Sequence, residues 1–115
     1  MAAAANRTLD EIVSQYEKQV FFFGKEGCKY CAMLEEDMNT LSIPFSVLKL
    51  GDTINGVDQS VIEEVKEKYN YKTFPMLFFG KEFMGGYSSF QQLCYTGEIQ
   101  NRLKSELDIE ITYSF

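Results

Sequence analysis

The feature that most constrains this chain is a continuous apolar run, Val20-Phe21-Phe22-Phe23, which stops at Gly24. An apolar run without alternation is typical of a strand that other elements cover on both faces. Such a strand can be buried only where layers of helix or sheet lie on both sides of its own sheet. The run therefore predicts an α/β chain with a central strand over residues 20–23.

The rest of the chain alternates between helical periodicity and short apolar runs. Thr8-Leu9-Asp10-Glu11 has the pattern of a capping box, so we predict a helix over about 8–18. Apolar stripes at helical spacing predict four more helices, and short apolar runs predict three more strands. In chain order these are a helix with the stripe Cys31, Leu34, Met38 and Leu41, a strand over 45–50, a polar loop over 51–56, a helix carrying Val57, Val61, Ile62, Val65 and Tyr69, a hairpin over 76–84 turning at Gly80, a helix that starts with a capping box at Ser88 or Ser89, and a last helix carrying Ile99, Leu103 and Leu107.

This order of elements predicts one mixed four-stranded sheet. The first two strands flank a helix, so they should be parallel neighbours joined by a right-handed crossover. The hairpin over 76–84 adds two antiparallel strands. We therefore expect a single α/β domain over residues 1–115, with helices on both faces of the sheet and with 1–7 and 109–115 as peripheral tails.

Length, charge and cysteine count narrow the class of protein. A chain of 115 residues suffices for one domain, and a formal net charge of −6 argues against non-specific binding to nucleic acid. No apolar run approaches the roughly 20 residues that cross a membrane. Three cysteines are an odd number for a secreted disulfide scaffold and favour a reducing compartment. We expect a cytoplasmic monomer that binds neither nucleic acid nor membranes.

The stretch that most directly indicates a chemical function is Cys28-Lys29-Tyr30-Cys31. Cys28 falls where a loop meets a helix N-terminus, and Cys31 lies on the apolar stripe of that helix. The N-terminal end of a helix carries partial positive charge and free N–H groups, which lower a thiol pKa of about 8.5 by one to several units. Lys25 and Lys29 act in the same direction. An exposed thiolate attacks a disulfide, and a second thiol one turn away resolves the product, so we predict Cys28 as nucleophile and Cys31 as resolving thiol.

Other interpretations of the cysteines stay open at this point, with less support. A structural zinc site needs about four ligands, and the chain has no His and only one further cysteine, so no metal site is expected. A purely structural disulfide would stabilise little because it closes so short a loop. Two buried cysteines without a role are the third alternative. Cys94 is interpreted as a buried apolar filler, with a regulatory or dimerising thiol as the alternative.

Three motifs, in this order, resemble those of the glutaredoxins. They are Lys25-Glu26-Gly27-Cys28-Lys29-Tyr30-Cys31, Lys72-Thr73-Phe74-Pro75 and Gly85-Gly86-Tyr87-Ser88-Ser89, and the resemblance extends over about residues 9–107. It implies the thioredoxin fold. It also implies a glutathione-dependent oxidoreductase that reduces protein disulfides and glutathione mixed disulfides, in electron transport and cell redox homeostasis. Ribonucleotide reductase is one client that the resemblance suggests.

The resemblance also implies a glutathione site. Tyr30 matches the aromatic residue between the family's two cysteines, and Lys25 matches the basic residue that contacts the glycine carboxylate of glutathione. Phe74-Pro75 resembles a turn whose proline is cis and whose preceding residue pairs its backbone with glutathione. Lys29, Lys72 and Thr73 would support the redox pair and this turn.

The third motif would hold the γ-glutamyl carboxylate through Gly86, Ser88 and Ser89. Two glycines let a backbone approach a ligand closely, and a following helix N-terminus offers N–H donors to an anion. Taken alone, the same residues are also what a turn and a helix cap require.

The chain departs from the family pattern at two of these positions. Lys29 replaces the proline of the family's C-P-Y-C, and some members without that proline bind a [2Fe–2S] cluster shared by two subunits and two glutathiones. A glutathione-ligated [2Fe–2S] carrier is therefore the alternative function. Ser89 stands where an acidic residue is common, which weakens one contact to the glutathione amine.

Overall fold

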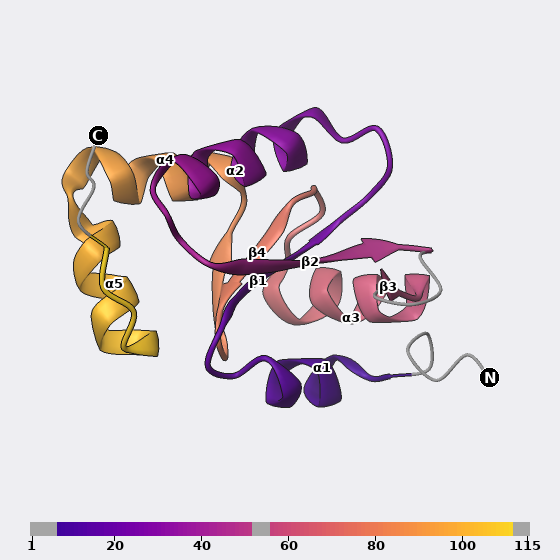
Figure 1. Cartoon of the computed structure of the whole chain (residues 1–115). Coiled ribbons are helices and arrows are strands. Elements are labelled where there is room, and N and C mark those ends of the chain that lie inside the picture. Colours follow the sequence, from indigo (N-terminus) through magenta and orange to yellow (C-terminus); the bar gives the residue numbers. More distant parts are fainter. Residues whose placement is uncertain (1–6, 52–55, 112–115) are drawn as a thin grey trace.

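The structure is a computed structural model that describes residues 7–51 and 56–111 (Figure 1). Parts of the predicted tails (1–6 and 112–115) and of the polar loop (52–55) lie outside the described residues. The elements in chain order are α1 (Leu9–Gln15), β1 (Val20–Gly24), α2 (Lys29–Thr40), β2 (Phe45–Leu50), β3 (Gly56–Val57), α3 (Gln59–Tyr69), β4 (Met76–Phe79), β5 (Glu82–Gly85), α4 (Tyr87–Thr96) and α5 (Glu98–Leu107).

The strands form one mixed sheet in the order β3-β2-β1-β4-β5. β1 pairs in parallel with β2, with Val20 opposite Phe45, and antiparallel with β4, with Val20 opposite Phe79. The predicted crossover and hairpin are thus confirmed. The predicted number of strands is wrong, because the sheet has five. The additional strand, β3, pairs in parallel with the edge of β2, and its Val57 was predicted to begin the following helix. A two-residue strand has no periodicity from which it could be recognised.

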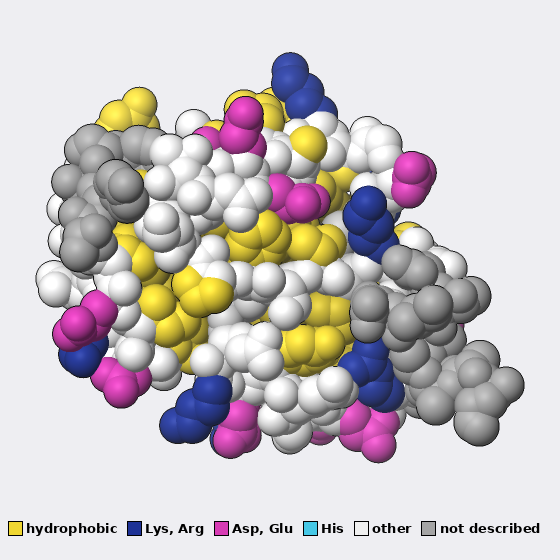
Figure 2. Space-filling model, in the orientation of Figure 1, with side chains coloured by type: hydrophobic (Ala, Val, Ile, Leu, Met, Phe, Trp, Pro, Cys, Tyr) yellow, Lys and Arg dark blue, Asp and Glu magenta, His cyan; other side chains and the backbone are white. Residues whose placement is uncertain are grey.

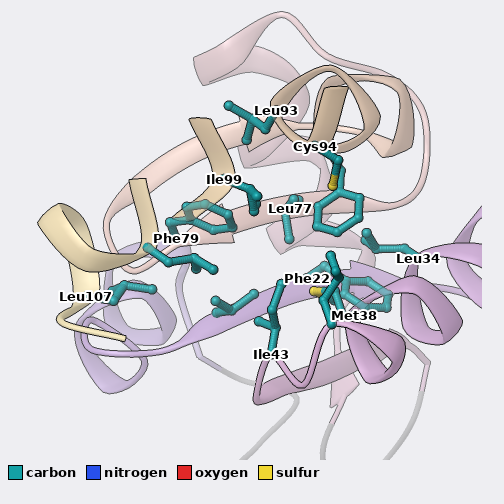
Figure 3. Packing of buried hydrophobic residues seen from close by; sticks show 14 of the residues in the cluster. Phe22, Leu34, Met38, Ile43, Leu77, Phe79, Leu93, Cys94, Ile99 and Leu107 are labelled. Atoms are coloured by element: carbon teal, nitrogen blue, oxygen red, sulfur yellow. The ribbon is translucent and has the colours of Figure 1, made fainter. Parts of the chain in front are cut away.

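Helices cover both faces of the sheet, α2, α4 and α5 on one face and α1 and α3 on the other (Figure 1). Every residue of β1 is buried. Val20 and Phe22 belong to the cluster with α2, α4 and α5, which Figure 3 shows from close by, and Phe21 and Phe23 belong to the cluster with α1 and α3. This alternation confirms that the apolar run is a central strand between two helical layers.

The helix ends agree with the sequence in one case and differ in two. The Thr8 side chain accepts a hydrogen bond from the Glu11 N–H at 3.2 Å, which confirms the capping box. α1 ends at Gln15 rather than near 18, because Glu17 and its neighbours form a turn that leads into β1. The predicted capping boxes at Ser88 and Ser89 are wrong, because the N-cap of α4 is Gly86, two residues before Ser88, and it has no side-chain capping hydrogen bond. No helix in the described part of the chain is long and apolar enough to cross a membrane.

Candidate redox site

Cys28 and Cys31 form a disulfide at the start of α2, with their Cα atoms 5.3 Å apart. Cys28 is the N-cap of the helix, and its Sγ accepts a hydrogen bond from the Cys31 N–H at 3.2 Å. Cys28 is half-buried, whereas Cys31 is only 5% exposed. The helix register thus makes Cys28 the more accessible sulfur and shelters Cys31, as the sequence predicted.

The local chain explains why the sulfurs lie here. β1 ends at Gly24, where the backbone passes so close that a Cβ atom would lie 3.4 Å from the Cys31 Sγ. Gly27 has φ +73°, a left-handed conformation that glycine adopts most readily, and it turns the chain into α2. The first turn of α2 contains no acidic side chain. The N–H donor and the partial positive charge of the helix end therefore favour a thiolate at Cys28 once the disulfide is reduced.

One groove beside the disulfide brings the three sequence motifs together. It has a volume of about 470 Å³, which lies in the range of small-molecule sites. Tyr30 contributes from the first motif, Thr73 and Phe74 from the second, and Ser88 from the third. We refer to it as the aromatic groove. The groove is completed by residues that the sequence analysis did not single out: Met33, Tyr71, Tyr87 and Gln91.

The second motif forms the turn before β4. The Phe74–Pro75 peptide bond is cis, as the resemblance implied. Pro75 is buried, Phe74 is half-buried, and the Lys25 Nζ lies 5.2 Å from the centroid of the Phe74 ring. This cation–π contact places the basic residue of the first motif at the border of the aromatic groove.

The two glycines of the third motif are buried and closely packed. Gly85 and Gly86 are both buried, and Gly85 has φ +92°. A Cβ atom at Gly86 would overlap the Tyr71 hydroxyl, so only glycine fits between this tyrosine and the chain. Ser88 is exposed on the wall of the aromatic groove.

The comparisons with known proteins agree with this geometry. A family model described as Glutaredoxin matches residues 20–84, and Glutaredoxin-1 of Mus musculus is 30% identical over 87 residues, which are 75% of this chain and 81% of the relative. This chain belongs to the glutaredoxin family. It is a glutathione-dependent thiol–disulfide oxidoreductase with a dithiol Cys28–Cys31 pair.

One further relative and one solved structure are similar to this glutaredoxin. An uncharacterized monothiol glutaredoxin, ycf64-like, from Synechocystis sp. is 28% identical over 102 residues, which are 86% of this chain and 91% of that protein. The crystal structure of a buckwheat glutaredoxin–glutathione complex superposes with a TM-score of 0.74 at 18% identity, over 84% of this chain and 87% of that one. The second similarity shows the shared thioredoxin fold.

The remaining predicted site residues lie around the aromatic groove rather than in it. Lys25 and Lys29 line a different hollow, next to Cys28. Ser89 lines a third hollow, and a Cβ atom at Gly85 would lie 2.6 Å from its Oγ. Lys72 is exposed and lines none of these three hollows. Within residues 7–51 and 56–111, no group of three or more His, Cys, Asp or Glu side chains is placed to hold a metal ion.

Tyr87 is the most informative residue that the sequence analysis missed. Its hydroxyl donates a 2.6 Å hydrogen bond to Asp37 Oδ2 on α2, and its ring centroid lies 5.9 Å from that of Tyr30. This hydrogen bond is the main reason that the pKa of Tyr87 is raised to about 12. Tyr87 thus connects the groove wall on α4 to the helix that carries both redox cysteines. Its position inside the third motif, directly after Gly86, was the signal that could have identified it.

Cys94 lies on α4 behind the groove and is 7% exposed. Figure 3 shows its side chain directed into the cluster that contains Leu34 and Leu77. Burial, and secondarily the charge of Asp37, raises the pKa of this thiol to about 11. The predicted burial is confirmed, and the raised pKa lowers the fraction of this thiol that is ionised at neutral pH.

Proposed function

We propose that this glutaredoxin uses Cys28 as the nucleophile and Cys31 as the resolving thiol, and that the aromatic groove holds the glutathione half of its substrates. The observation that carries the proposal is the convergence of three separate sequence motifs on one groove beside an accessible N-cap sulfur. If the three motifs had only structural roles, there would be no reason for them to meet in one groove beside the accessible sulfur.

The reaction on a protein disulfide has two exchange steps. The Cys28 thiolate attacks one substrate sulfur, forms a mixed disulfide and releases the other substrate sulfur as a thiolate. Cys31, after losing its proton, then attacks the Cys28 Sγ and releases the reduced substrate, which leaves the Cys28–Cys31 disulfide. Two glutathione molecules reduce that disulfide and leave as glutathione disulfide. The Cα separation of 5.3 Å is compatible with the second step without backbone movement.

A glutathione mixed disulfide requires only Cys28. Its thiolate attacks the glutathione sulfur, the client leaves as a thiolate, and a second glutathione then regenerates Cys28. Cys31 is therefore dispensable for this substrate.

Glutathione would be held along the aromatic groove by hydrogen-bond donors, positively charged side chains and the walls of the groove. The Gly86 N-cap of α4 has no side-chain capping hydrogen bond, so the first-turn N–H groups near Gly86 and Ser88 are suited to the γ-glutamyl carboxylate. The Phe74 backbone before Pro75 would pair with the peptide, with Tyr30 and Thr73 as neighbouring walls. Lys25 would face the glycine carboxylate, and Lys29 and Lys72 would add positive charge. Ser89 points toward Gly85, so its contribution would be the smallest.

The proposal is tested by turnover of a glutathionylated peptide in an assay coupled to glutathione reductase and NADPH. We expect saturable turnover that requires glutathione. In parallel, the Cys28 thiolate of the Cys31→Ser, Cys94→Ser protein is titrated by its ultraviolet absorbance with and without S-methylglutathione. A ligand in the groove should shift this titration and protect Cys28 from alkylation. Absence of glutathione-dependent turnover would refute the proposed function.

We also propose a monomer that works in a reducing compartment such as the cytoplasm, with protein clients that include enzymes of the ribonucleotide reductase type. The odd number of cysteines and the burial of Cys94 support this choice. Sedimentation equilibrium of the reduced protein tests the monomer, and localisation of a fluorescent fusion tests the compartment.

A [2Fe–2S] carrier is the second candidate, favoured by one observation, Lys29 in place of proline at the second position of the Cys28–Cys31 motif. A shared cluster would be ligated by Cys28 of two copies and by two glutathiones, because Cys31 and Cys94 are buried. Anaerobic reconstitution with iron, sulfide and glutathione should then give a coloured dimer. A colourless monomer after reconstitution rejects this candidate.

A further inference from the structure

The hydrogen bond between Tyr87 and Asp37 joins the aromatic groove to a residue that lies outside it. Tyr87 lines the groove, and its hydroxyl donates to Asp37 Oδ2 at 2.6 Å. Asp37 is not part of the groove lining. It lines a separate hollow of about 280 Å³, which is completed by Gln91, Cys94 and Tyr95. Asp37 is therefore placed to act on a ligand in the groove through Tyr87 rather than by contact.

This hydrogen bond gives the packing of α4 on α2 a fixed direction. The core between the two helices is apolar and includes Leu34 and Met38 from α2 and Cys94 from α4 (Figure 3). Apolar attraction is non-directional, whereas a hydrogen bond requires its donor and acceptor within a narrow range of distance and angle. The Tyr87 hydroxyl therefore fixes the first residue of α4 relative to the helix that carries the redox cysteines.

Two parts of the proposed glutathione site depend on where Tyr87 is held. Its ring centroid lies 5.9 Å from that of Tyr30, and Tyr30 is 53% exposed, so the two rings together form the wall of the groove on this side. We refer to this ring pair as the tyrosine wall. Tyr87 also follows the Gly86 N-cap directly, where the first turn of α4 offers its N–H donors.

Asp37 differs from its two acidic neighbours on α2. Glu35, Glu36 and Asp37 are consecutive, and Figure 2 shows acidic side chains in magenta on the surface where Figure 1 places α2. Asp37 is half-buried and accepts the Tyr87 hydroxyl. Glu36 is exposed and lines neither the groove nor the hollow beside Asp37. Glu36 therefore offers a control that has the same charge on the same helix.

We propose that Asp37 is a positioning residue for glutathione, which acts through the Tyr87 hydroxyl to hold the tyrosine wall in the shape that binds the glutathionyl group. Without this bond, the two rings and the first turn of α4 adopt other positions in the free protein, and ligand binding must order them. The apparent affinity then falls with the fraction of molecules whose wall is in place. This inference rests on the proposed function. A disulfide without a glutathionyl group does not use the groove, so its reaction with Cys28 should not depend on Asp37.

The test compares two disulfides in a single turnover of the reduced Cys31→Ser protein. Glutathione disulfide carries the glutathionyl group, and bis(2-hydroxyethyl) disulfide does not. In both reactions the Cys28 thiolate forms a bond to one sulfur, the sulfur–sulfur bond breaks, and the other sulfur leaves with the electron pair as a thiolate. The measured quantity is the ratio of the two second-order rate constants. A variant that only lowers the fraction of folded protein changes both rate constants equally and leaves this ratio unchanged.

Three substitutions in the Cys31→Ser protein probe the hydrogen bond. Tyr87→Phe keeps the ring and removes only the hydroxyl, so the ratio should fall about threefold to tenfold. Asp37→Leu removes the acceptor and should give a fall of the same size. Asp37→Asn keeps an oxygen that accepts the hydroxyl, so the ratio should stay within about twofold of the parent value. Tyr87→Phe and Asp37→Leu together should lower the ratio no further than either alone, because both remove one bond.

Glu36→Leu is the matched control. It removes the same charge from the neighbouring residue and leaves the hydrogen bond of Tyr87 in place. Glutathione disulfide is an anion and bis(2-hydroxyethyl) disulfide is neutral, so this variant measures any purely electrostatic change in the ratio. Because Glu36 is exposed and screened by salt, the ratio should stay within about twofold of the parent value.

The outcomes separate this inference from the proposed function. An unchanged ratio in Tyr87→Phe and Asp37→Leu, or an equal fall in Glu36→Leu, would overturn the inference and leave the proposed function intact. If the parent protein reacts no faster with glutathione disulfide than with bis(2-hydroxyethyl) disulfide, the groove does not bind the glutathionyl group, and the proposed function and the inference fail together. If Asp37→Leu does not fold, Tyr87→Phe decides between these outcomes.

Discussion

The redox pair and Cys94 have the same side-chain chemistry in opposite surroundings. Cys28 caps the N-terminus of α2, its sulfur accepts an N–H hydrogen bond, and lysines lie around it. Cys94 lies in the last turns of α4, is buried, and faces a carboxylate. The first setting stabilises a thiolate and the second stabilises a thiol. Reactivity in this protein is therefore set by position on a helix and by neighbouring charge.

Helix α2 takes part in both settings. Its N-terminus supports Cys28, and two turns later its Asp37 raises the pKa of Cys94 and accepts the hydrogen bond of Tyr87. A single helix thus presents positive potential to one cysteine and negative charge to another. Five experiments test this difference between the two cysteines.

The largest effect should come from Cys28→Ser. A serine hydroxyl is not ionised at neutral pH and cannot start the exchange, so turnover of every disulfide substrate should fall at least about 1000-fold. The measurement is the glutathione-coupled assay. Cys94→Ser is the matched control and should keep the activity of the unmodified protein. Retained turnover in Cys28→Ser would show that the N-cap sulfur is not the nucleophile.

Alkylation of the reduced protein measures the contrast directly. At pH 7 a thiol with a pKa of about 11 is ionised in only about one molecule in 10,000, and burial of Cys94 slows its reaction further. Iodoacetamide should therefore modify Cys28 at least about 1000 times faster than Cys94. Peptide mass spectrometry over time gives both rates, and Cys28→Ser, Cys31→Ser isolates Cys94. Similar alkylation rates at Cys28 and Cys94 would show that their surroundings do not set their reactivity.

Cys31→Ser should separate the two substrate classes. Without the resolving thiol the mixed disulfide with a protein persists, so reduction of an intramolecular protein disulfide should fall about 100-fold. Reduction of a small glutathione mixed disulfide should stay within about threefold of the unmodified protein, because only Cys28 takes part. Equal losses on both substrates would contradict the assigned division of labour.

The contrast between the two cysteines was largely predictable, because helical spacing determines which side chains face the core. The positions of Cys28 and Cys31 on α2, the buried Cys94, and the central strand over 20–23 all follow from periodicity. The Thr8 cap follows from a local pattern of side chains.

The parts that could not be predicted depend on contacts between distant segments. Nothing in the local sequence shows that Tyr87 reaches Asp37, fifty residues earlier, or that Tyr71 packs under Gly86. The two-residue β3 is held by pairing with β2 and has no pattern of its own. Ser88 and Ser89 match a capping box, yet the N-cap of α4 is Gly86, which packs closely against Tyr71. Lys49 reaches the hollow next to Cys28 only through strand register.

Asp37→Asn should reduce the difference between the surroundings of Cys28 and Cys94 without abolishing it. Removing the negative charge should lower the pKa of Cys94 from about 11, but only partly, because burial is the larger cause. The pKa of Tyr87 should fall from about 12 toward the ordinary value for tyrosine. The pH dependence of Cys94 alkylation and of tyrosinate absorbance measures the two shifts. Unchanged profiles would show that Asp37 does not influence either group.

The sign of the Tyr87 effect also sets a pH dependence of stability. The pKa of Tyr87 is higher in the folded protein, about 12, than in the unfolded chain, about 10. Its contribution is therefore fully present below pH 10 and is lost as the pH rises from about 10 to 12. In Asp37→Asn this loss should be smaller over the same interval.

The smallest effect should come from Tyr87→Phe, which keeps the ring beside Tyr30 and removes only the hydroxyl. The Asp37 carboxylate, a charged acceptor, then loses the hydrogen bond that the Tyr87 hydroxyl donates, so the free energy of unfolding should fall by about 1–2 kcal/mol. Urea unfolding at pH 7 measures this change. The matched control is Tyr95→Phe on the same helix, because Tyr95 is 84% exposed and should be neutral. If the hydrogen bond is what couples α4 to α2, Tyr87→Phe and Asp37→Asn together should destabilise the protein by less than the sum of their separate effects. Simple additivity, or equal stability of the two phenylalanine variants, would mean that the groove wall and the redox helix are held together by packing alone.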